Sequence, residues 1–287
     1  MASAGRPDEP IGRALIRLLA SDLDGTLLRS DNTVSQATRD ALADAEAAGL
    51  IIAFVTGRPP RWLHEVAEAT GHRGVAVSAN GALTYDLHTE TVVAEHPLPP
   101  GVLSEVTSVL RAKIPQVRFA LEYGLDFAYE PEYRHDWEIS PETDRAGRRL
   151  PTPVAVDLTG LLDKPAVKLL AKGHGLAPDE FMDLVEALVG DQVTVTRSGH
   201  SPLVEISATG ITKAFGLAAL ADSHGVSRHQ VAAVGDMPND VPMLEWAGQS
   251  YAVANAHPSA LAAAGTVLAE TNDEDAVAKL IRTLLHS

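Results

Sequence analysis

Two aspartates separated by one residue, Asp22 and Asp24, stand just after an apolar run at residues 15–20. The run predicts a buried strand, and Gly25 lets the chain turn directly behind it. Two carboxylates in one small volume can share a reaction, because one can attack as a nucleophile while the other transfers protons. So much negative charge also needs a nearby cation. The segment therefore indicates a phosphoryl-transfer site.

The same acidic pattern occurs in calcium-binding loops, where Asp-x-Asp-Gly is part of the EF-hand sequence. Aligning Gly25 with the fixed glycine of that loop puts Ala20, which has no side-chain ligand atom, at the first ligand position. An EF-hand also needs a helix before the loop, whereas residues 15–20 read as a strand. A plain metal site or an ordinary loop stays the alternative to catalysis for these residues taken alone.

Composition limits the classes of partner. The chain has 287 residues, enough for one large domain or two modest ones, and 45% of them are hydrophobic, as in globular proteins. Its 23 Lys and Arg against 38 Asp and Glu give a net charge of −15. Such a surface repels nucleic acid and anionic membranes, so neither is expected as a partner. An anionic substrate would need locally placed cations. The absence of cysteine excludes disulfides, thiol catalysis and cysteine-ligated zinc.

The amino terminus carries no visible targeting signal. Residues 1–13 are polar, contain Gly and Pro, and are expected to form a flexible tail. No run of about twenty apolar residues appears without polar breaks, so no transmembrane helix is expected. These features favour a cytoplasmic protein and leave the oligomeric state open.

Strands and helices alternate in two parts of the chain. In the first part we expect strands at 15–20, 50–55 and 74–78, and helices at 36–48 and 59–71. In the second we expect helices at 213–224, 240–247 and 273–285, and strands at 231–234 and 251–253. Apolar strands alternating with helices predict a Rossmann-like parallel sheet with helices on both faces, a three-layer α/β/α core.

The pattern changes between these two parts. Residues 97–101 contain three prolines and a glycine, which indicate a hinge, and polar-rich strands follow. We expect residues 98–206 to form an inserted α+β cap domain, with helices on one face of its sheet and the other face pointing outward. Residues 14–97 and 207–287 would then form the core.

Two further features suit an anion. Thr56 and Gly57 follow an expected strand and precede a helix, where free N–H groups and the helix dipole favour phosphate. Lys213 lies near the start of a helix, where the dipole disfavours a cation unless an anion is also present. Read alone, the threonine could be a helix cap and the lysine a surface group.

A second acidic group follows the strand at 231–234. It contains Asp236, Asn239 and Asp240, whose oxygens suit Mg²⁺, although the same residues could be an ordinary helix entry. Because the carboxyl ends of parallel strands meet at one edge of a sheet, we expect this group to converge with Asp22 and Asp24.

Taken together, these motifs resemble the haloacid dehalogenase (HAD) superfamily of aspartyl phosphotransferases. The closest resemblance is to its Cof-type (IIB) branch, in which a large cap is inserted between the second and third motifs. The matching segments are residues 22–26, residues 56–58, Lys213, and Gly235-Asp236 with Asn239-Asp240. Residues 78–82 also resemble the segment after the third strand of that branch. The resemblance covers both core segments, whereas the cap agrees in position and size only.

The resemblance implies a Mg²⁺-dependent phosphatase. Asp22 would attack phosphorus and form a phospho-aspartate, while Asp24 would protonate the leaving alkoxide and then activate water. The implied phosphate ligands are Thr56, the Gly57 backbone, Lys213 and Asn239. The implied metal ligands are the Asp22 carboxylate, the Asp24 backbone carbonyl and Asp236, with Asp240 supporting the ion through water.

The expected substrate is a small phosphorylated metabolite, with a sugar phosphate as the first candidate. The alternatives are a phosphosugar mutase with the same site and a non-catalytic sensor of a phosphorylated ligand. Arg58 could contact substrate or bond to nearby carboxylates. Tyr129, Tyr133 and Trp137 could line the substrate face of the cap or pack in its core. The 11 histidines show no metal-ligand spacing and are expected to be surface or packing residues.

Overall fold

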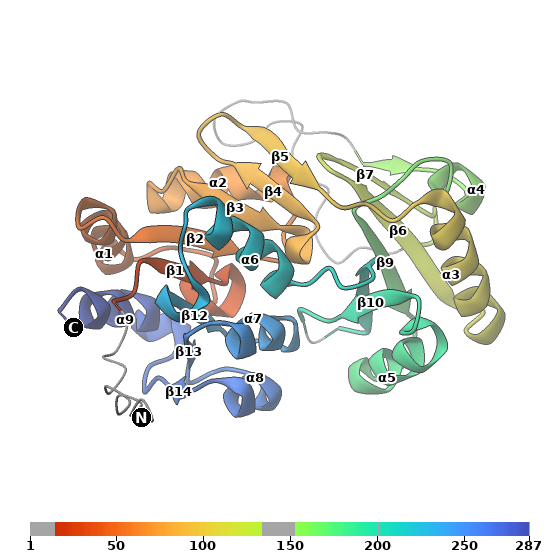
Figure 1. Ribbon diagram of the computed structural model, residues 1–287. Helices are drawn as coiled ribbons and strands as arrows, with labels where there is room; N and C mark the ends of the chain where they lie inside the picture. Colours follow the sequence, from red (N-terminus) through yellow and green to blue (C-terminus); the bar gives the residue numbers. More distant parts are fainter. Residues whose placement is uncertain (1–14, 134–152, 200, 287) are drawn as a thin grey trace, which may run out of the picture.

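The structure contains two separate β-sheets (Figure 1). It is a computed structural model that describes residues 15–133, 153–199 and 201–286. The larger sheet has eight strands in the order β14-β13-β12-β1-β2-β3-β4-β5, and the smaller has six in the order β10-β11-β9-β6-β7-β8. The fold is therefore α/β, with a Rossmann-like core, as predicted. The tail predicted at residues 1–13 lies outside the described residues.

Six strands of the larger sheet are parallel. They are β1 (Leu18–Ser21), β2 (Ile51–Val55), β3 (Val75–Ser78), β12 (Val231–Gly235), β13 (Gln249–Ala252) and β14 (Thr266–Val267). Both faces of β1 are buried, as expected for a central strand. Each strand and helix predicted for this core is present, with its ends shifted by four residues at most.

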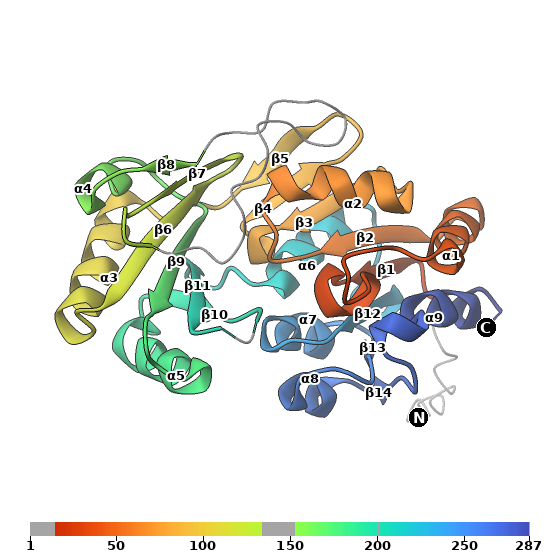
Figure 2. The ribbon, with the colours of Figure 1, turned by 180° about the vertical axis from the view of Figure 1, so that it is seen from behind.

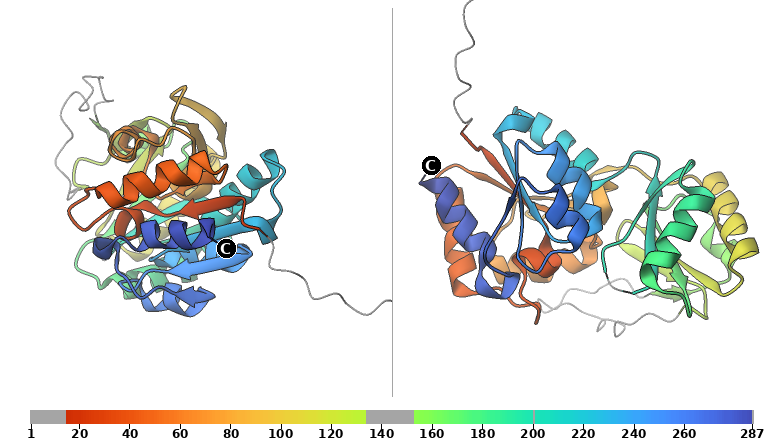
Figure 3. Two further views of the ribbon diagram at one scale, coloured as in Figure 1. Left: turned by 90° about the vertical axis from the view of Figure 1, so that its left-hand side faces the viewer. Right: turned by 90° about the horizontal axis from the view of Figure 1, so that it is seen from below.

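Helices cover both faces of this sheet (Figure 3, right). One layer contains α1 (Gln36–Ala47), α2 (Leu63–Thr70) and α9 (Ala276–Leu285). The other contains α6 (Lys213–Ser223), α7 (Val241–Trp246) and α8 (Pro258–Ala263). Short 3₁₀ turns connect these elements: η2 (Pro60–Trp62), η3 (Ala79–Gly81), η4 (Arg228–Gln230), η5 (Pro238–Asp240) and η6 (Asn272–Glu274). No helix in the described ranges combines the length and apolar character needed to cross a membrane.

One edge of this sheet was not predicted from the sequence. There β4 (Leu83–Asp86) and β5 (Thr91–Glu95) extend the sheet as an antiparallel hairpin. The Asp86 carboxylate accepts the backbone N–H groups of His88 at 2.8 Å and Thr89 at 2.9 Å, which closes a tight turn. Because so short a connection has no room for a crossover helix, the two strands must run in opposite directions.

The smaller sheet and its helices are called the cap below. Its strands are β6 (Val117–Tyr123), β7 (Asp126–Tyr129), β8 (Val154–Ala155), β9 (Lys168–Gly173), β10 (Val193–Thr196) and β11 (Leu203–Ala208). Its helices are α3 (Pro100–Lys113), α4 (Leu158–Leu161) and α5 (Pro178–Val189). An apolar cluster joins α3 and α5 to the sheet through side chains such as Leu103, Phe181 and Phe119. We propose that the cap spans residues 98–206, as predicted from the sequence. Strand β11 continues two residues beyond residue 206.

The opposite face of the cap sheet was predicted to point outward, which is wrong. This face turns toward the core, and the helices lie on the outer side (Figure 2). It carries three charged side chains, Glu122, Lys168 and Glu205, that are 2–6% exposed. Buried charges need partners, and these residues bond to groups of the core, which accounts for the orientation.

Candidate active site

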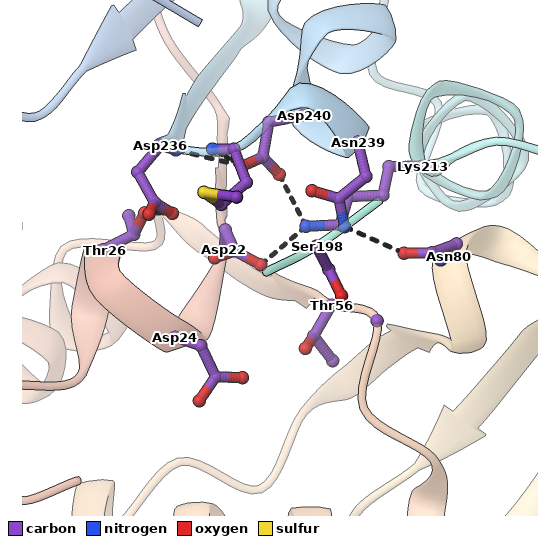
Figure 4. Close-up of polar contacts among 12 residues, drawn as sticks. Asp22, Asp24, Thr26, Thr56, Asn80, Ser198, Lys213, Asp236, Asn239 and Asp240 are labelled. Carbon is purple, nitrogen blue, oxygen red and sulfur yellow. Dashed lines mark hydrogen bonds and ion pairs between the residues drawn. The ribbon is translucent and has the colours of Figure 1, made fainter. Parts of the chain in front are cut away.

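Two parallel strands bring three aspartates together at the carboxyl edge of the larger sheet (Figure 4). Asp22 follows β1 and Asp236 follows β12, and these strands are hydrogen-bonded neighbours in parallel register. Asp240 comes from η5, the turn after Asp236. Ligand oxygens of the three buried side chains all lie within 4.8 Å of one another. The structure therefore joins the early and late acidic motifs.

Lys213 lies between two of these carboxylates (Figure 4). Its Nζ donates to Asp22 Oδ1 at 2.6 Å and to Asp240 Oδ1 at 2.5 Å, and the side chain is 1% exposed. Burial alone would lower the pKa of Lys213, but the two carboxylates raise it above its usual value, so the lysine stays charged. The carboxylates also offset the unfavourable dipole at the start of α6.

The three aspartates still carry more negative charge than one lysine balances. Burial raises the pKa of Asp22 well above its usual value, Lys213 opposes this effect, and the neighbouring carboxylates add to it. Burial and the charge of Asp240 raise the pKa of Asp236 to about 6, although Thr26 donates to its Oδ1 at 2.8 Å. Oxygen-rich clusters with excess negative charge suit a divalent cation, so these residues fit one.

Asp240 differs from the other two aspartates because both of its oxygens are engaged. Its Oδ2 accepts the N–H groups of Asp236 at 2.9 Å and Met237 at 2.8 Å, and its Oδ1 accepts from the lysine. Asp22 and Asp236 are thus better placed to coordinate a cation directly. Gly25, at φ 75°, keeps the space around them open, since a Cβ there would lie 2.5 Å from Asp236 Oδ2.

Asp24 stands apart from the buried cluster (Figure 4). Its side chain is 49% exposed and accepts two hydrogen bonds from the Arg58 guanidinium, one of them from Nε to Oδ2 at 2.8 Å. Arg58 therefore bonds to a nearby carboxylate, one of the two roles expected for it. Both residues line the same cavity.

Apart from Lys213, the residues expected to bind phosphate follow β2 or lie on η5. Thr56 follows β2, is fully buried, and its Oγ1 accepts the N–H of Arg58 at 3.0 Å. Asn239 on η5 donates from Nδ2 to Asn80 Oδ1 at 3.0 Å. A Cβ on Gly57 would lie 3.1 Å from that Asn80 oxygen, so only glycine leaves this approach free of crowding. These groups gather into one polar wall.

A cavity of about 210 Å³ connects these groups. Five predicted site residues line it, namely Asp22, Asp24, Thr56, Gly57 and Asn239. The other three, Lys213, Asp236 and Asp240, are not part of its lining and contact Asp22 or each other. The structure therefore brings all eight predicted positions to one site.

Sequence reasoning missed the cap side of this cavity. Its lining includes Glu122, Lys168, Leu170, Ser198, Leu203 and Glu205. On one sequence these residues look like ordinary strand or loop positions, and the only signal for them was a set of charges inside apolar strands. Tyr133 and Tyr129 pack with Phe127 and Leu170, so they belong to the cap's own packing, whereas Trp137 lies outside the described residues.

Known proteins match this chain over nearly its whole length. Residues 19–281 match the family described as haloacid dehalogenase-like hydrolase. Pyridoxal phosphate phosphatase YbhA of Escherichia coli is 30% identical, covering 92% of this chain and 97% of its own. The 5-amino-6-(5-phospho-D-ribitylamino)uracil phosphatase YitU of Bacillus subtilis is 28% identical, covering 92% and 96%. A haloacid dehalogenase-like hydrolase structure from B. subtilis has a TM-score of 0.79 at 24% identity, covering 93% and 99%.

Proposed function

This chain belongs to the haloacid dehalogenase-like hydrolase family and is a phosphatase, and from that premise we propose that it hydrolyses a small phosphorylated metabolite in a Mg²⁺-dependent reaction through a phospho-aspartate. One observation carries the proposal. Three buried carboxylates with a single lysine among them lie beside a cavity that reaches Asp22. Such an arrangement suits transfer of a phosphoryl group, which needs positioning and charge neutralisation.

Asp22 is the proposed nucleophile. One of its carboxylate oxygens forms a bond to phosphorus while the bond from phosphorus to the ester oxygen breaks. The ion pair with Lys213 holds Asp22 Oδ1, which orients the carboxylate and leaves its second oxygen for the reaction. The product of this step is a phospho-aspartate and an alcohol.

Asp24 is the proposed acid and base. It gives a proton to the departing alkoxide, then takes one from a water molecule whose oxygen attacks phosphorus and releases Asp22 as a free carboxylate. Inorganic phosphate is the second product. The Arg58 guanidinium donates to both Asp24 oxygens, so Asp24 must leave this pair before it can take up the proton that it gives to the alkoxide.

The phosphate oxygens are held by a set that we call the phosphate grip: Thr56, the Gly57 backbone, Lys213 and Asn239. Among the described residues, Thr56 Oγ1 only accepts a hydrogen bond and Asn239 Nδ2 donates a single one, so each group keeps a hydrogen to donate. These hydrogens are suited to phosphate oxygens. Lys213 and a bound divalent cation would together supply the local positive charge that the acidic surface lacks.

A divalent cation would be held by the carboxylates of Asp22 and Asp236 and by the backbone carbonyl of Asp24. Asp240 would support the ion indirectly, because its own oxygens are engaged with backbone N–H groups and Lys213. When bound, Mg²⁺ would supply charge that neutralises the phosphoryl oxygens. These residues are the proposed metal site.

The leaving group would occupy the cap side of the cavity. Glu122, Lys168 and Ser198 offer hydrogen-bond donors and acceptors there, and the volume of about 210 Å³ suits a small group. This lining supports a hydroxyl-rich substrate such as a sugar phosphate. The relatives named above act on substrates of different kinds, so the cavity is the better guide.

A phosphate-release panel tests the proposal. Small metabolite phosphates are incubated with the protein in Mg²⁺ and, separately, in EDTA. We expect metal-dependent release of inorganic phosphate from at least one sugar phosphate. Isomerised sugar phosphate without free phosphate would instead indicate a mutase, and tight binding without any turnover would indicate a sensor.

A further inference from the structure

Two oppositely charged side chains of the cap sheet are buried against the core. Lys168 on β9 is 2% exposed and Glu205 on β11 is 6% exposed. Lys168 Nζ lies 3.7 Å from Glu205 Oε1, so their charges balance locally. Both residues also bond to core groups, and neither of them takes part in the proposed bond-making and proton-transfer steps.

Lys168 connects to the phosphate grip through a peptide group. Its Nζ donates to the carbonyl oxygen of Gly57 at 2.6 Å. That carbonyl belongs to the peptide between Gly57 and Arg58, whose N–H donates to Thr56 Oγ1 at 3.0 Å. Because a peptide group is planar, holding its oxygen also sets the direction of its N–H. The lysine therefore helps to fix Thr56 Oγ1 as an acceptor, which leaves the hydroxyl hydrogen to turn toward the cavity.

Glu205 connects to the other side of the grip through two amides. Its Oε2 accepts a hydrogen bond from Asn80 Nδ2, and Asn80 Oδ1 accepts from Asn239 Nδ2 at 3.0 Å. An amide has a donor end and an acceptor end, so the carboxylate decides which way Asn80 faces. Asn80 in turn decides the orientation of Asn239, whose second N–H is then available to a ligand.

We propose that Lys168 and Glu205 are positioning residues that complete the phosphate grip when the cap is docked on the core. Each starts a chain of hydrogen bonds that ends on a phosphate ligand, Thr56 in one case and Asn239 in the other. In the Lys168 chain the positive charge polarises the peptide group, which strengthens donation by the Thr56 hydroxyl. In the Glu205 chain the carboxylate acts by fixing the orientation of the two amides. The inference rests on the proposed function, because the two ligands are assigned there.

The two residues also line the cavity, so a direct contact with the leaving group is the competing explanation. The two explanations predict different effects on phosphate affinity and on the range of substrates affected. If the two residues position the phosphate grip, their substitution lowers the affinity for phosphate itself, and the effect on turnover is the same for every leaving group. A leaving-group contact affects only substrates that can use it.

The decisive variant is Lys168→Met, which keeps the length of the side chain and removes its donor. Calorimetry with inorganic phosphate in Mg²⁺ is expected to show about a 10- to 100-fold loss of affinity, the range for a lost hydrogen bond to a charged group. We expect kcat/KM to fall by the same factor for para-nitrophenyl phosphate and for a sugar phosphate from the panel. Lys168→Arg, which restores a charged donor, should recover most of the loss.

A matched control and a second variant complete the test. Lys172 stands four residues further along β9, on the same face and 8% exposed, and Lys172→Met should leave phosphate affinity unchanged. Glu205→Met should weaken phosphate binding like Lys168→Met, while Glu205→Gln, which keeps an acceptor for Asn80, should retain most of it. If Lys168→Met fails to fold, the two Glu205 variants carry the same prediction.

Unchanged phosphate affinity in Lys168→Met and Glu205→Met would overturn the inference, as would a loss confined to one leaving group. Equal effects of Lys172→Met and Lys168→Met would also overturn it, because they would reflect general damage to the cap. A protein that binds phosphate but releases none from any substrate would refute the proposed function, and the affinity measurements would still decide the roles of these two residues.

Discussion

The core side and the cap side of the site are built in different ways. In the core, Asp22, Thr56 and Asp236 each follow a parallel strand, so neighbouring strands deliver them to one edge. In the cap, Glu122 and Lys168 stand opposite each other within antiparallel strands and reach the site from a sheet face. The proposed catalytic residues thus lie where the order of the strands sets their positions, whereas the contacts of the cap depend on how its sheet packs against the core.

The two sides also differ in their charge balance. The core cluster combines three buried aspartates with one lysine. On the cap side, Glu122 and Glu205, which line the cavity, each have a cationic partner: Arg61 for the first and Lys168 for the second. The excess negative charge of the aspartate cluster suits an added cation. The neutral pairs of Glu with Arg or Lys suit a surface on which the cap packs against the core. Four measurements can break or sharpen this distinction.

The largest effect is expected for Asp22→Asn on the core side. An amide cannot form the phospho-aspartate, so kcat should fall by on the order of 10⁴-fold or more, as for other lost nucleophiles. The variant should remain folded, because it removes a buried charge whose pKa is already raised. Phosphate release and thermal unfolding measure the two outcomes. Activity near that of the unsubstituted protein would remove the covalent mechanism.

The next effect concerns the balanced pair between core and cap. Arg61 Nη2 donates to Glu122 Oε1 at 2.9 Å, and the side chains are 7% and 2% exposed. Arg61→Met should cost about 3–5 kcal/mol of unfolding free energy, because it leaves a buried carboxylate without its partner. Urea denaturation provides the measurement.

The exposed pair of Arg118 and Glu132 in the cap is the control for that prediction. Glu132 is 72% exposed, and Arg118→Met should cost only about 0–1 kcal/mol, as is usual for surface pairs. Equal losses in the two arginine variants would contradict the view that the buried pair holds the cap against the core.

A smaller effect is expected at the proposed metal site. Asp236→Asn should raise the Mg²⁺ concentration needed for half-maximal activity by about 100-fold. Loss of a residue that only hydrogen-bonds to a metal ligand already lowers metal affinity by about 10–100-fold. The variant Asp273→Asn, in an exposed aspartate of the core, is the control. A Mg²⁺ dependence that is the same in both variants would show that the unbalanced cluster is not the metal site.

The smallest effect lies away from the site, at His72 in the core. Burial lowers the pKa of His72 below its usual 6.5, although Glu46 opposes this effect. The folded state therefore favours neutral His72, so its contribution to stability is complete above about pH 6.5 and is lost as the pH falls below it.

The comparison of His72→Gln with His224→Gln, at an exposed position, tests this. The free energy of unfolding is measured by urea denaturation between pH 5 and 8. It should fall less steeply toward acid pH in His72→Gln than in the unsubstituted protein, whereas His224→Gln should show no such change. An unchanged pH dependence would mean that protonation of His72 does not govern the stability of the protein in this range. It would also mean that burying a titratable group outside the aspartate cluster has little effect on the stability of the core.

The sequence predicted the core side well because each of its functional residues stands in a recognisable local context. Asp22 follows an apolar run, and Asp236 follows another, so strand ends could be recognised without knowing the fold. The hairpin of β4 and β5 was missed because its turn depends on one side chain, Asp86, that accepts two backbone N–H groups.

The cap side could not be predicted in the same way. Lys168 lies in the apolar context of β9, and the carbonyl it contacts is 111 residues away in the sequence. Asn80 belongs to the segment 78–82, which resembles the family, but its partner Glu205 lies 125 residues further along the chain. Such contacts are set by the docking of two sheets, for which a single sequence carries no local signal.

The placement of the cap between the two halves of the core has a consequence during synthesis. Asp22 and its lysine partner are 191 residues apart, and the whole cap is translated between them. At about 5–20 residues per second, the ribosome needs roughly 10–40 s to cover that distance. Throughout this interval the emerging aspartate has no ammonium to stabilise it in a buried position. A nascent polypeptide that ends before Lys213 therefore lacks this ion pair, and the proposed site can form only after Lys213, Asp236 and Asp240 have been added.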